Sequence, residues 1–180
     1  MRIKCFFWIL FSMMTLHTSA QKYVSEKGLI TFFSEAAIED IKGINPKASS
    51  MLNTSTADIA FVVPIREFQF EKKLMQDHFN EKYMESEKYP KATFSGKLEG
   101  FVATGVPDVR QVKAKGKLVI HGVTQEVEIS GTVETTSQNI LIKSKFLIRL
   151  EDYKVKIPQL MWQNIAEEVE VSLEFTYKPQ

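Results

Sequence analysis

The sequence predicts an all-β protein, an eight-stranded antiparallel barrel with one or two short helices, and three observations lead there. Most of the chain after residue 20 alternates apolar and polar residues, the pattern of strands with one buried and one solvated face. Helical periodicity is confined to short stretches, and the strand–helix–strand alternation of parallel sheets is absent. A closed barrel removes the free sheet edges. A two-sheet sandwich fits the same pattern and remains an alternative.

The first twenty residues have the features of a secretory signal peptide. Arg2 and Lys4 form a basic start, an apolar run extends from Cys5 to Leu16, and the small residue Ala20 ends the segment. This apolar run is too short to cross a bilayer, which needs about 20 residues. We therefore expect cleavage after Ala20, a barrel domain over residues 21–180, and a periplasmic or secreted location.

Charge and cysteine content limit the partners. Loss of two basic residues and no acids with residues 1–20 changes the formal net charge from +1 to −1. Nucleic acid is not an expected partner, because phosphate binding requires a basic surface. The single cysteine, Cys5, leaves with the signal peptide, so the mature domain must fold without disulfides.

The predicted strands follow from the alternation along the chain. The last is the clearest, because five apolar residues from Val169 to Tyr177 alternate with polar ones in "EVEVSLEFTY". The predicted strands are residues 28–34, 48–52, 57–65, 92–100, 113–120, 126–133, 139–150 and 168–177.

One predicted hairpin turns at His121-Gly122. Gly122 can adopt the positive φ that a tight hairpin requires, so His121 is interpreted as a turn residue. A hydrogen bond from His121 at the opening of a tunnel is the alternative. The lysines at 113, 115 and 117 are expected to pair across this hairpin with Glu126 and Glu128.

Two segments have helical patterns. In "EKKLMQDHFNEKYM" (residues 71–84), Met75, Phe79 and Tyr83 recur at a spacing of four, which predicts a short amphipathic helix. The stretch "PQLMWQNIAEE" after Pro158 is a candidate for a second helical turn.

No metal, cofactor or catalytic residue is predicted. The two histidines of the mature chain, His78 and His121, are 43 positions apart, and the mature chain has no cysteine to complete a zinc site. No GxSxG nucleophile motif occurs. The paired carboxylates fall on outer strand faces or near turns, where they act as solubilising charge.

Two longer motifs resemble the YceI-like family, as a Bacteroidetes-type member. In residues 70–100 and 116–131, the order and spacing follow the family's helix with its "YP-x-A/I-T-F" continuation and its "G-x-L-x-I-H-G-V-T-x-x-V" hairpin. Asp152-Tyr153 is similar to an acidic–aromatic pair on a later family strand, and the likeness covers about residues 57–178. The matching residues are Leu74, His78, Phe79, Tyr89, Pro90, Thr93, Phe94, Gly116, Leu118, Ile120, His121, Gly122, Val123, Thr124 and Val127.

The resemblance implies a lipocalin-like barrel, exported from a bacterium, with a long apolar tunnel that holds a polyisoprenoid or similar lipid. It carries over no catalytic residues. The N-terminal segment "GLITFFSEAAIEDIKGINPK" departs from the family's usual F-x-V/I-K-H segment and the G-x-F after it.

The residues alone indicate an exported barrel with an aromatic-rich interior, which fits a filled core or a cavity. The resemblance adds the expected function, that of a non-enzymatic protein that sequesters or carries an amphipathic lipid such as a polyisoprenoid or isoprenoid quinone. A second copy of the chain, in a homodimer, is a further candidate partner. The alternatives are a solid-cored structural or stress-response barrel without lipid, and an enzyme acting on an exported small molecule. The small inward residues Gly96, Ala114, Gly116 and Gly131 favour a cavity. The candidate tunnel residues are Phe61, Val63, Phe68, Phe79, Phe94, Leu118, Ile120, Val127, Ile129, Phe146 and Ile148.

Overall fold

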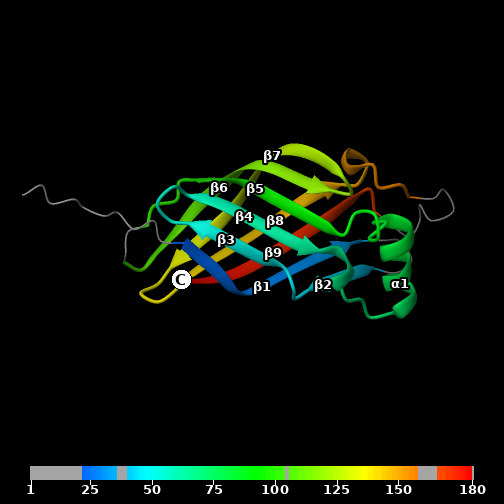
Figure 1. Ribbon diagram of the computed structural model, residues 1–180, viewed down its shortest axis with the longest axis horizontal. Helices are drawn as coiled ribbons and strands as arrows, with labels where there is room; N and C mark the ends of the chain where they lie inside the picture. The colour runs from blue at the N-terminus through cyan, green and yellow to red at the C-terminus, as the bar shows by residue number, and fades with distance from the viewer. Residues whose placement is uncertain (1–21, 36–39, 104–105, 158–165, 180) are drawn as a thin grey trace, which may run out of the picture.

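The computed structural model describes residues 22–35, 40–103, 106–157 and 166–179. Over these residues the chain is mostly β-strand (Figure 1). The predicted signal peptide, residues 1–20, lies outside the described residues, as does most of the helical turn predicted after Pro158. The strands are β1 (Lys22–Ser34), β2 (Ile41–Asn45), β3 (Ser49–Asn53), β4 (Asp58–Pro64), β5 (Lys91–Glu99), β6 (Asp108–Ile120), β7 (Val123–Thr135), β8 (Ile140–Arg149) and β9 (Glu168–Pro179).

The described strands close into an antiparallel barrel. From β3 to β9 each strand pairs with the next, and β1 pairs with both β9 and β3 to complete the ring. The strands are inclined to the long axis of the molecule (Figure 1). The prediction of an eight-stranded antiparallel barrel is confirmed, and the sandwich alternative is excluded.

The segments β2 and β3 act as one interrupted strand of this ring. Val24 of β1 pairs with Met51 of β3, and Ile30 of β1 pairs with Asn45 of β2, so both segments share one register on β1. The buried Asn45 stabilises the interruption, because its amide donates to the Pro64 carbonyl at 2.8 Å and its Oδ1 accepts from the Lys47 amide at 2.9 Å. The nine strand segments of the described chain therefore occupy eight strand positions around the barrel, because β2 and β3 share one.

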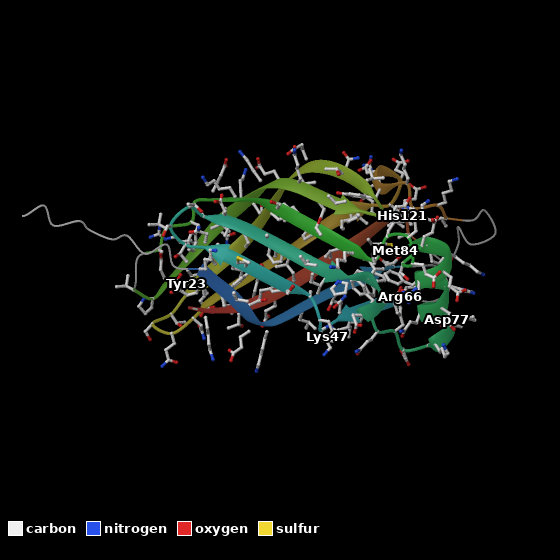
Figure 2. All side chains as sticks on the ribbon, viewed as in Figure 1. Tyr23, Lys47, Arg66, Asp77, Met84 and His121 are labelled. Carbon is white, nitrogen blue, oxygen red and sulfur yellow. The ribbon has the colours of Figure 1, made fainter. Side chains whose placement is uncertain are left out.

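Helical structure gathers at one end of the barrel. The helix α1 (Lys73–His78) continues directly into the π-helical turn η2 (Phe79–Tyr83), as the spacing of apolar residues predicted. Two 3₁₀ turns complete the helical structure that the described residues contain, η1 (Ile65–Glu67) and η3 (Glu151–Tyr153). Figure 2 shows His121, Met84 and Asp77 at this end and Tyr23 at the other.

The end of the barrel opposite α1 is filled by side chains. Leu52, Phe175 and Tyr177 have no exposed surface there. They come from β3 and β9, the two strands that flank β1. This end is a packed core of the kind that any small domain needs.

The predicted hairpin and its charge pairs are confirmed. His121 and Gly122, with φ of 51° and 73°, form the two-residue turn between the paired residues Ile120 and Val123. Positive φ at both turn positions matches the right-handed twist of the flanking strands. On the outer face, Lys113 and Lys115 pair with Glu128, and Lys117 pairs with Glu126.

Candidate functional site

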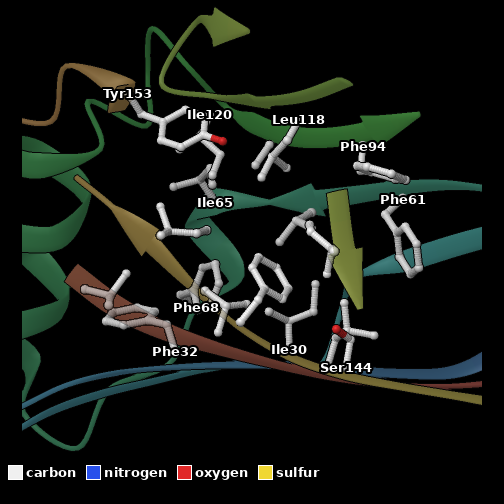
Figure 3. Close-up of a pocket in the computed structure, with 18 of the residues that line it drawn as sticks. Ile30, Phe32, Phe61, Ile65, Phe68, Phe94, Leu118, Ile120, Ser144 and Tyr153 are labelled. Carbon is white, nitrogen blue, oxygen red and sulfur yellow. The ribbon is translucent and has the colours of Figure 1, made fainter. Parts of the chain in front are cut away.

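An apolar cavity of about 440 Å³ lies inside the barrel and extends from the α1 end to Ile142, the residue that pairs with Phe175. Its wall comes from most strands of the ring, together with η1, α1 and η2. Ile30, Phe61 and Leu118 show how the strands contribute, with side chains that point inward from β1, β4 and β6 (Figure 3). The volume lies in the range of small-molecule sites, about 300–1,000 Å³, and such sites are mostly apolar.

Ten of the eleven predicted tunnel residues lie on the wall of this cavity. Val127 does not, although it is partly buried against the core. It lies on a stretch of β7 that pairs with β6 but has separated from β8. The ten on the wall are Phe61, Val63, Phe68, Phe79, Phe94, Leu118, Ile120, Ile129, Phe146 and Ile148. Contact of these residues with a lipid stays a prediction.

Four phenylalanines form one cluster at the α1 end of the cavity. The ring of Phe32 stacks on Phe79 with centroids 5.4 Å apart, and it meets Phe68 and Phe70 edge-on at 5.4 and 5.6 Å. Phe79 also contacts Phe68 at 5.3 Å and Phe70 at 4.9 Å. We call these residues the aromatic cluster. Each ring lines the cavity, so the cluster both packs this end and forms part of the wall.

Phe32 and Phe70 also line the cavity, although the sequence pattern does not predict it. Phe32 is followed by Phe33, so the alternation in "GLITFFS" does not show which of the two points inward. The pairing of β1 with β9 decides it, because Phe32 lies opposite the buried Val171. Phe70 lies between the predicted strand over residues 57–65 and the predicted helix over residues 71–84, in a stretch without periodicity.

The floor of the cavity is aromatic as well. Phe61 contacts the fully buried Phe175 edge-on, with centroids 4.9 Å apart, and lies 6.2 Å from Phe94. A Cβ at Gly96 would come within 2.8 Å of Phe94 Cζ, so this glycine makes room for the Phe94 ring. Of the four small residues expected to leave volume, Ala114 and Gly131 line the cavity, whereas Gly96 and Gly116 do not.

Polar groups on the cavity wall are few and dispersed. Ser144 Oγ donates to the Ser130 carbonyl at 2.6 Å, and Ser34 Oγ accepts from the Ala166 amide at 3.1 Å. Burial raises the pKa of Tyr83 and Tyr153, and the Asp152 carboxylate adds to the shift at Tyr153. Among the described residues, no group of three or more His, Cys, Asp or Glu side chains is arranged to hold a metal ion.

His121 lies beside the cavity wall and is not part of it. Its side chain is only 9% exposed, its Nδ1 lies 3.3 Å from the Tyr153 carbonyl, and its Nε2 lies 3.6 Å from Glu85 Oε1. The Tyr89 ring packs edge-on against it at 4.4 Å. The imidazole therefore joins the β6–β7 turn to η3 and to the segment before β5. The hydrogen-bond partner of the His121 ring is thus a backbone carbonyl of η3, and a hydrogen bond from His121 at a tunnel opening stays a prediction.

The described part of the chain contains no helix that is both long and apolar enough to cross a membrane. The family model of the YceI-like domain matches residues 16–177. No curated protein matches the chain.

Several solved structures share the fold. A polyisoprenoid binding domain from Saccharophagus degradans, implicated in plant cell wall breakdown, has a TM-score of 0.75 at 16% identity and covers 88% of this chain and 98% of its own. BcnA of Burkholderia cenocepacia has a TM-score of 0.70 at 17% identity, with 83% and 95% covered. The YCEI protein of Campylobacter jejuni has a TM-score of 0.62 at 16% identity, with 81% and 88% covered. At these identities the likeness establishes the shared fold.

Proposed function

This chain belongs to the YceI-like family, and from that premise we propose that it is an exported protein that binds an amphipathic long-chain lipid in its barrel. The ligand class is a polyisoprenoid or an isoprenoid quinone. The protein sequesters or carries this lipid and does not transform it. The polyisoprenoid binding domain of Saccharophagus degradans, which has the same fold, supports this ligand class.

The observation that carries the proposal is the apolar cavity of about 440 Å³. A hydrocarbon chain gains about 0.8 kcal/mol for each CH₂ group that it buries, so many weak contacts supply the affinity without a charged anchor. The hydroxyls on the wall, such as those of Ser34 and Ser144, are suited to one or two hydrogen bonds with a neutral polar end.

The distribution of packing favours a carrier over the alternatives. A solid-cored structural barrel describes only the end around Phe175 and Tyr177, whereas the rest of the barrel encloses the cavity. An enzyme would require convergent titratable groups inside the barrel. The hydroxyls on this wall are dispersed among apolar residues. Export rests on the N-terminal sequence pattern, with its basic start and short apolar run.

A matched pair of substitutions tests the proposal. Ala114 lines the cavity, whereas Ala60 lies on the exposed face of β4. Ala114→Phe places a ring in the space that the lipid would occupy, and Ala60→Phe adds the same ring outside. We expect saturable binding of dansyl-labelled farnesol to the wild type and to Ala60→Phe, with affinity lowered about tenfold or more in Ala114→Phe, or about 1.4 kcal/mol. Equal affinities, or no saturable binding at all, would contradict the proposal.

A further inference from the structure

Among the described residues, the pairing between β7 and β8 is incomplete. These strands pair only from Gly131 opposite Ser144 to Thr135 opposite Ile140. Beyond this rung, β7 continues to pair with β6 as far as Val123, and β8 continues to pair with β9 as far as Arg149. The two strands therefore separate while each keeps its other neighbour. We call the space between residues 126–130 and 145–149 the β7–β8 window.

The window has a firm boundary at each end. At one end, Ser144 Oγ donates to the Ser130 carbonyl beside the last rung. At the other end η3 bridges the strands, because Gln125 Nε2 donates to the Asp152 carbonyl at 2.9 Å, and His121 Nδ1 lies 3.3 Å from the Tyr153 carbonyl. These contacts bound the separated stretch of the two strands at both ends.

The cavity reaches this window from inside. Ile129, Phe146 and Ile148, which border it, line the cavity. Ser130, Gly131, Ser144 and Leu173 line the cavity and also a separate depression on the outer surface. The wall at the end of the window thus has the cavity on one side and an indentation on the other.

The rim of the window suits an apolar chain. Leu147 is 63% exposed. Its immediate neighbours on β8, Phe146 and Ile148, point inward and line the cavity, and the next outward residues along the strand are charged. The neighbouring charges are already paired, since Lys145 lies 2.8 Å from Glu170 and Glu128 lies 3.2 Å from Lys115. A hydrocarbon chain that passes Leu147 therefore meets an apolar side chain and charges that are already paired. Its passage does not require the desolvation of an unpaired charge, which would be costly.

Packed side chains occupy both ends of the barrel among the described residues. The aromatic cluster packs the end beneath α1 with five ring contacts of 4.9 to 5.6 Å. The opposite end contains the fully buried Leu52, Phe175 and Tyr177. A chain that entered through either end would have to displace packed side chains, which is costly.

We infer that the β7–β8 window is the portal through which the hydrocarbon chain of the ligand enters and leaves the cavity. The inference rests on the proposed function and adds a route to it. The chain passes sideways between the strands, and the Ser130 and Ser144 region lies where the polar end of the lipid remains. The competing route lies beside α1, where Leu74 lines the cavity and is 66% exposed.

Three conjugates separate the routes. In a Cys5→Ser chain, which removes the only native thiol, Leu147→Cys, Leu74→Cys and Val109→Cys are each coupled to a polyethylene-glycol maleimide. The three native side chains are similarly exposed, at 63%, 66% and 66%, and Val109 is not part of the cavity wall. Stopped-flow mixing with dansyl-labelled farnesol measures uptake, and competition with unlabelled farnesol measures release. We expect both rates to fall about tenfold or more for the Leu147 conjugate at similar affinity, and to stay within about twofold for the others.

A reversible disulfide gives an independent test. Glu128→Cys and Leu147→Cys occupy positions that would face each other if the β7–β8 register continued, so their disulfide draws the window shut. Lys117→Cys and Glu126→Cys form the control, because these residues are already paired in the closed β6–β7 ladder. We expect the first disulfide to slow uptake and its reduction to restore the wild-type rate, with no change for the control.

The outcomes distinguish the portal from the function. If the probe fails to bind the unmodified protein, the proposed function fails and the portal with it. If the probe binds normally but the Leu74 conjugate alone slows uptake, the ligand enters beside α1 and the portal inference is wrong, while the function stands. Unchanged rates in both the Leu147 conjugate and the oxidised disulfide would also overturn the portal.

Discussion

The hydroxyl of Tyr177 lies 2.6 Å from Ser50 Oγ in the filled end of the barrel. Ser50 Oγ donates in turn to the Ala60 carbonyl at 2.8 Å, so the tyrosine hydroxyl is the donor to Ser50. Tyr177 has no exposed surface and Ser50 is 5% exposed. The two residues lie on β9 and β3, on either side of β1. This buried link holds the closure of the barrel at the end opposite α1.

Removing either partner should destabilise the fold to a different extent. Ser50→Ala leaves the buried Tyr177 hydroxyl and the Ala60 carbonyl without their partner, which costs about 1–3 kcal/mol. Tyr177→Phe removes one hydrogen bond and leaves Ser50 bonded to Ala60, so we expect about 1 kcal/mol. Urea unfolding of both single variants and of the double variant measures this. An additive double variant would contradict a direct coupling between the two hydroxyls.

Alkaline pH should destabilise the protein through the same tyrosine. Burial raises the pKa of Tyr177 well above its ordinary value, and the hydrogen bond with Ser50 only partly opposes this shift. The unfolded chain therefore releases the phenolic proton first, so stability is complete below about pH 10 and declines above it. We expect a shallower decline for Tyr177→Phe in urea unfolding between about pH 8 and 11. Parallel curves for the two proteins would show that this tyrosine contributes nothing to the decline.

The filled end and the cavity wall should respond differently to the same truncation. Phe175→Ala empties a site with no exposed surface, and we expect a loss of about 3–5 kcal/mol. Phe146 already faces the cavity and is partly exposed, so Phe146→Ala should cost less than half as much. Chemical denaturation of both variants provides the comparison. Equal losses would indicate that the cavity wall is as tightly packed as the filled end.

The β6–β7 turn should depend on Gly122 for two reasons. Its φ of 73° is in the left-handed region, and a Cβ there would come within 2.5 Å of Tyr89 Cε1. Gly100, with φ of 84° and its nearest atom 3.3 Å away, has the strain without a comparable clash. We expect Gly100→Ala to cost about 1–2 kcal/mol and Gly122→Ala clearly more, measured by thermal unfolding. Equal losses would show that Tyr89 moves aside freely.

Much of the fold was predictable because the strands alternate so regularly. The faces of β6 and β9 follow from Leu118 and Phe175 with their polar neighbours, and the hairpin follows from Gly122. The segment β2 was missed, because "IKGIN" is short and contains a glycine, and only its pairing with β1 makes it a strand. The first strand also begins six residues earlier than predicted, at Lys22, because β9 and β3 pair with a stretch that lacks apolar alternation.

The candidate site was predictable as a set of inward residues but not as a space. Alternation places Phe61 and Phe146 inside the barrel, yet it does not show that Phe175 fills one end while the rest of the barrel encloses a cavity. The position of Val127 shows the same limit. It has the right periodicity for the wall, but the separation of β7 from β8 depends on long-range pairing that no local pattern reveals.

Native mass spectrometry shows whether the protein carries a lipid in its barrel. The protein is purified from the compartment where it accumulates in its own host, without detergent, and weighed before and after organic extraction. We expect a reproducible additional mass that is recovered in the extract as a prenyl chain or quinone, and the same spectrum shows whether the carrier is a monomer or a homodimer. An apo mass that stays unchanged after incubation with isoprenoids and quinones would contradict the account.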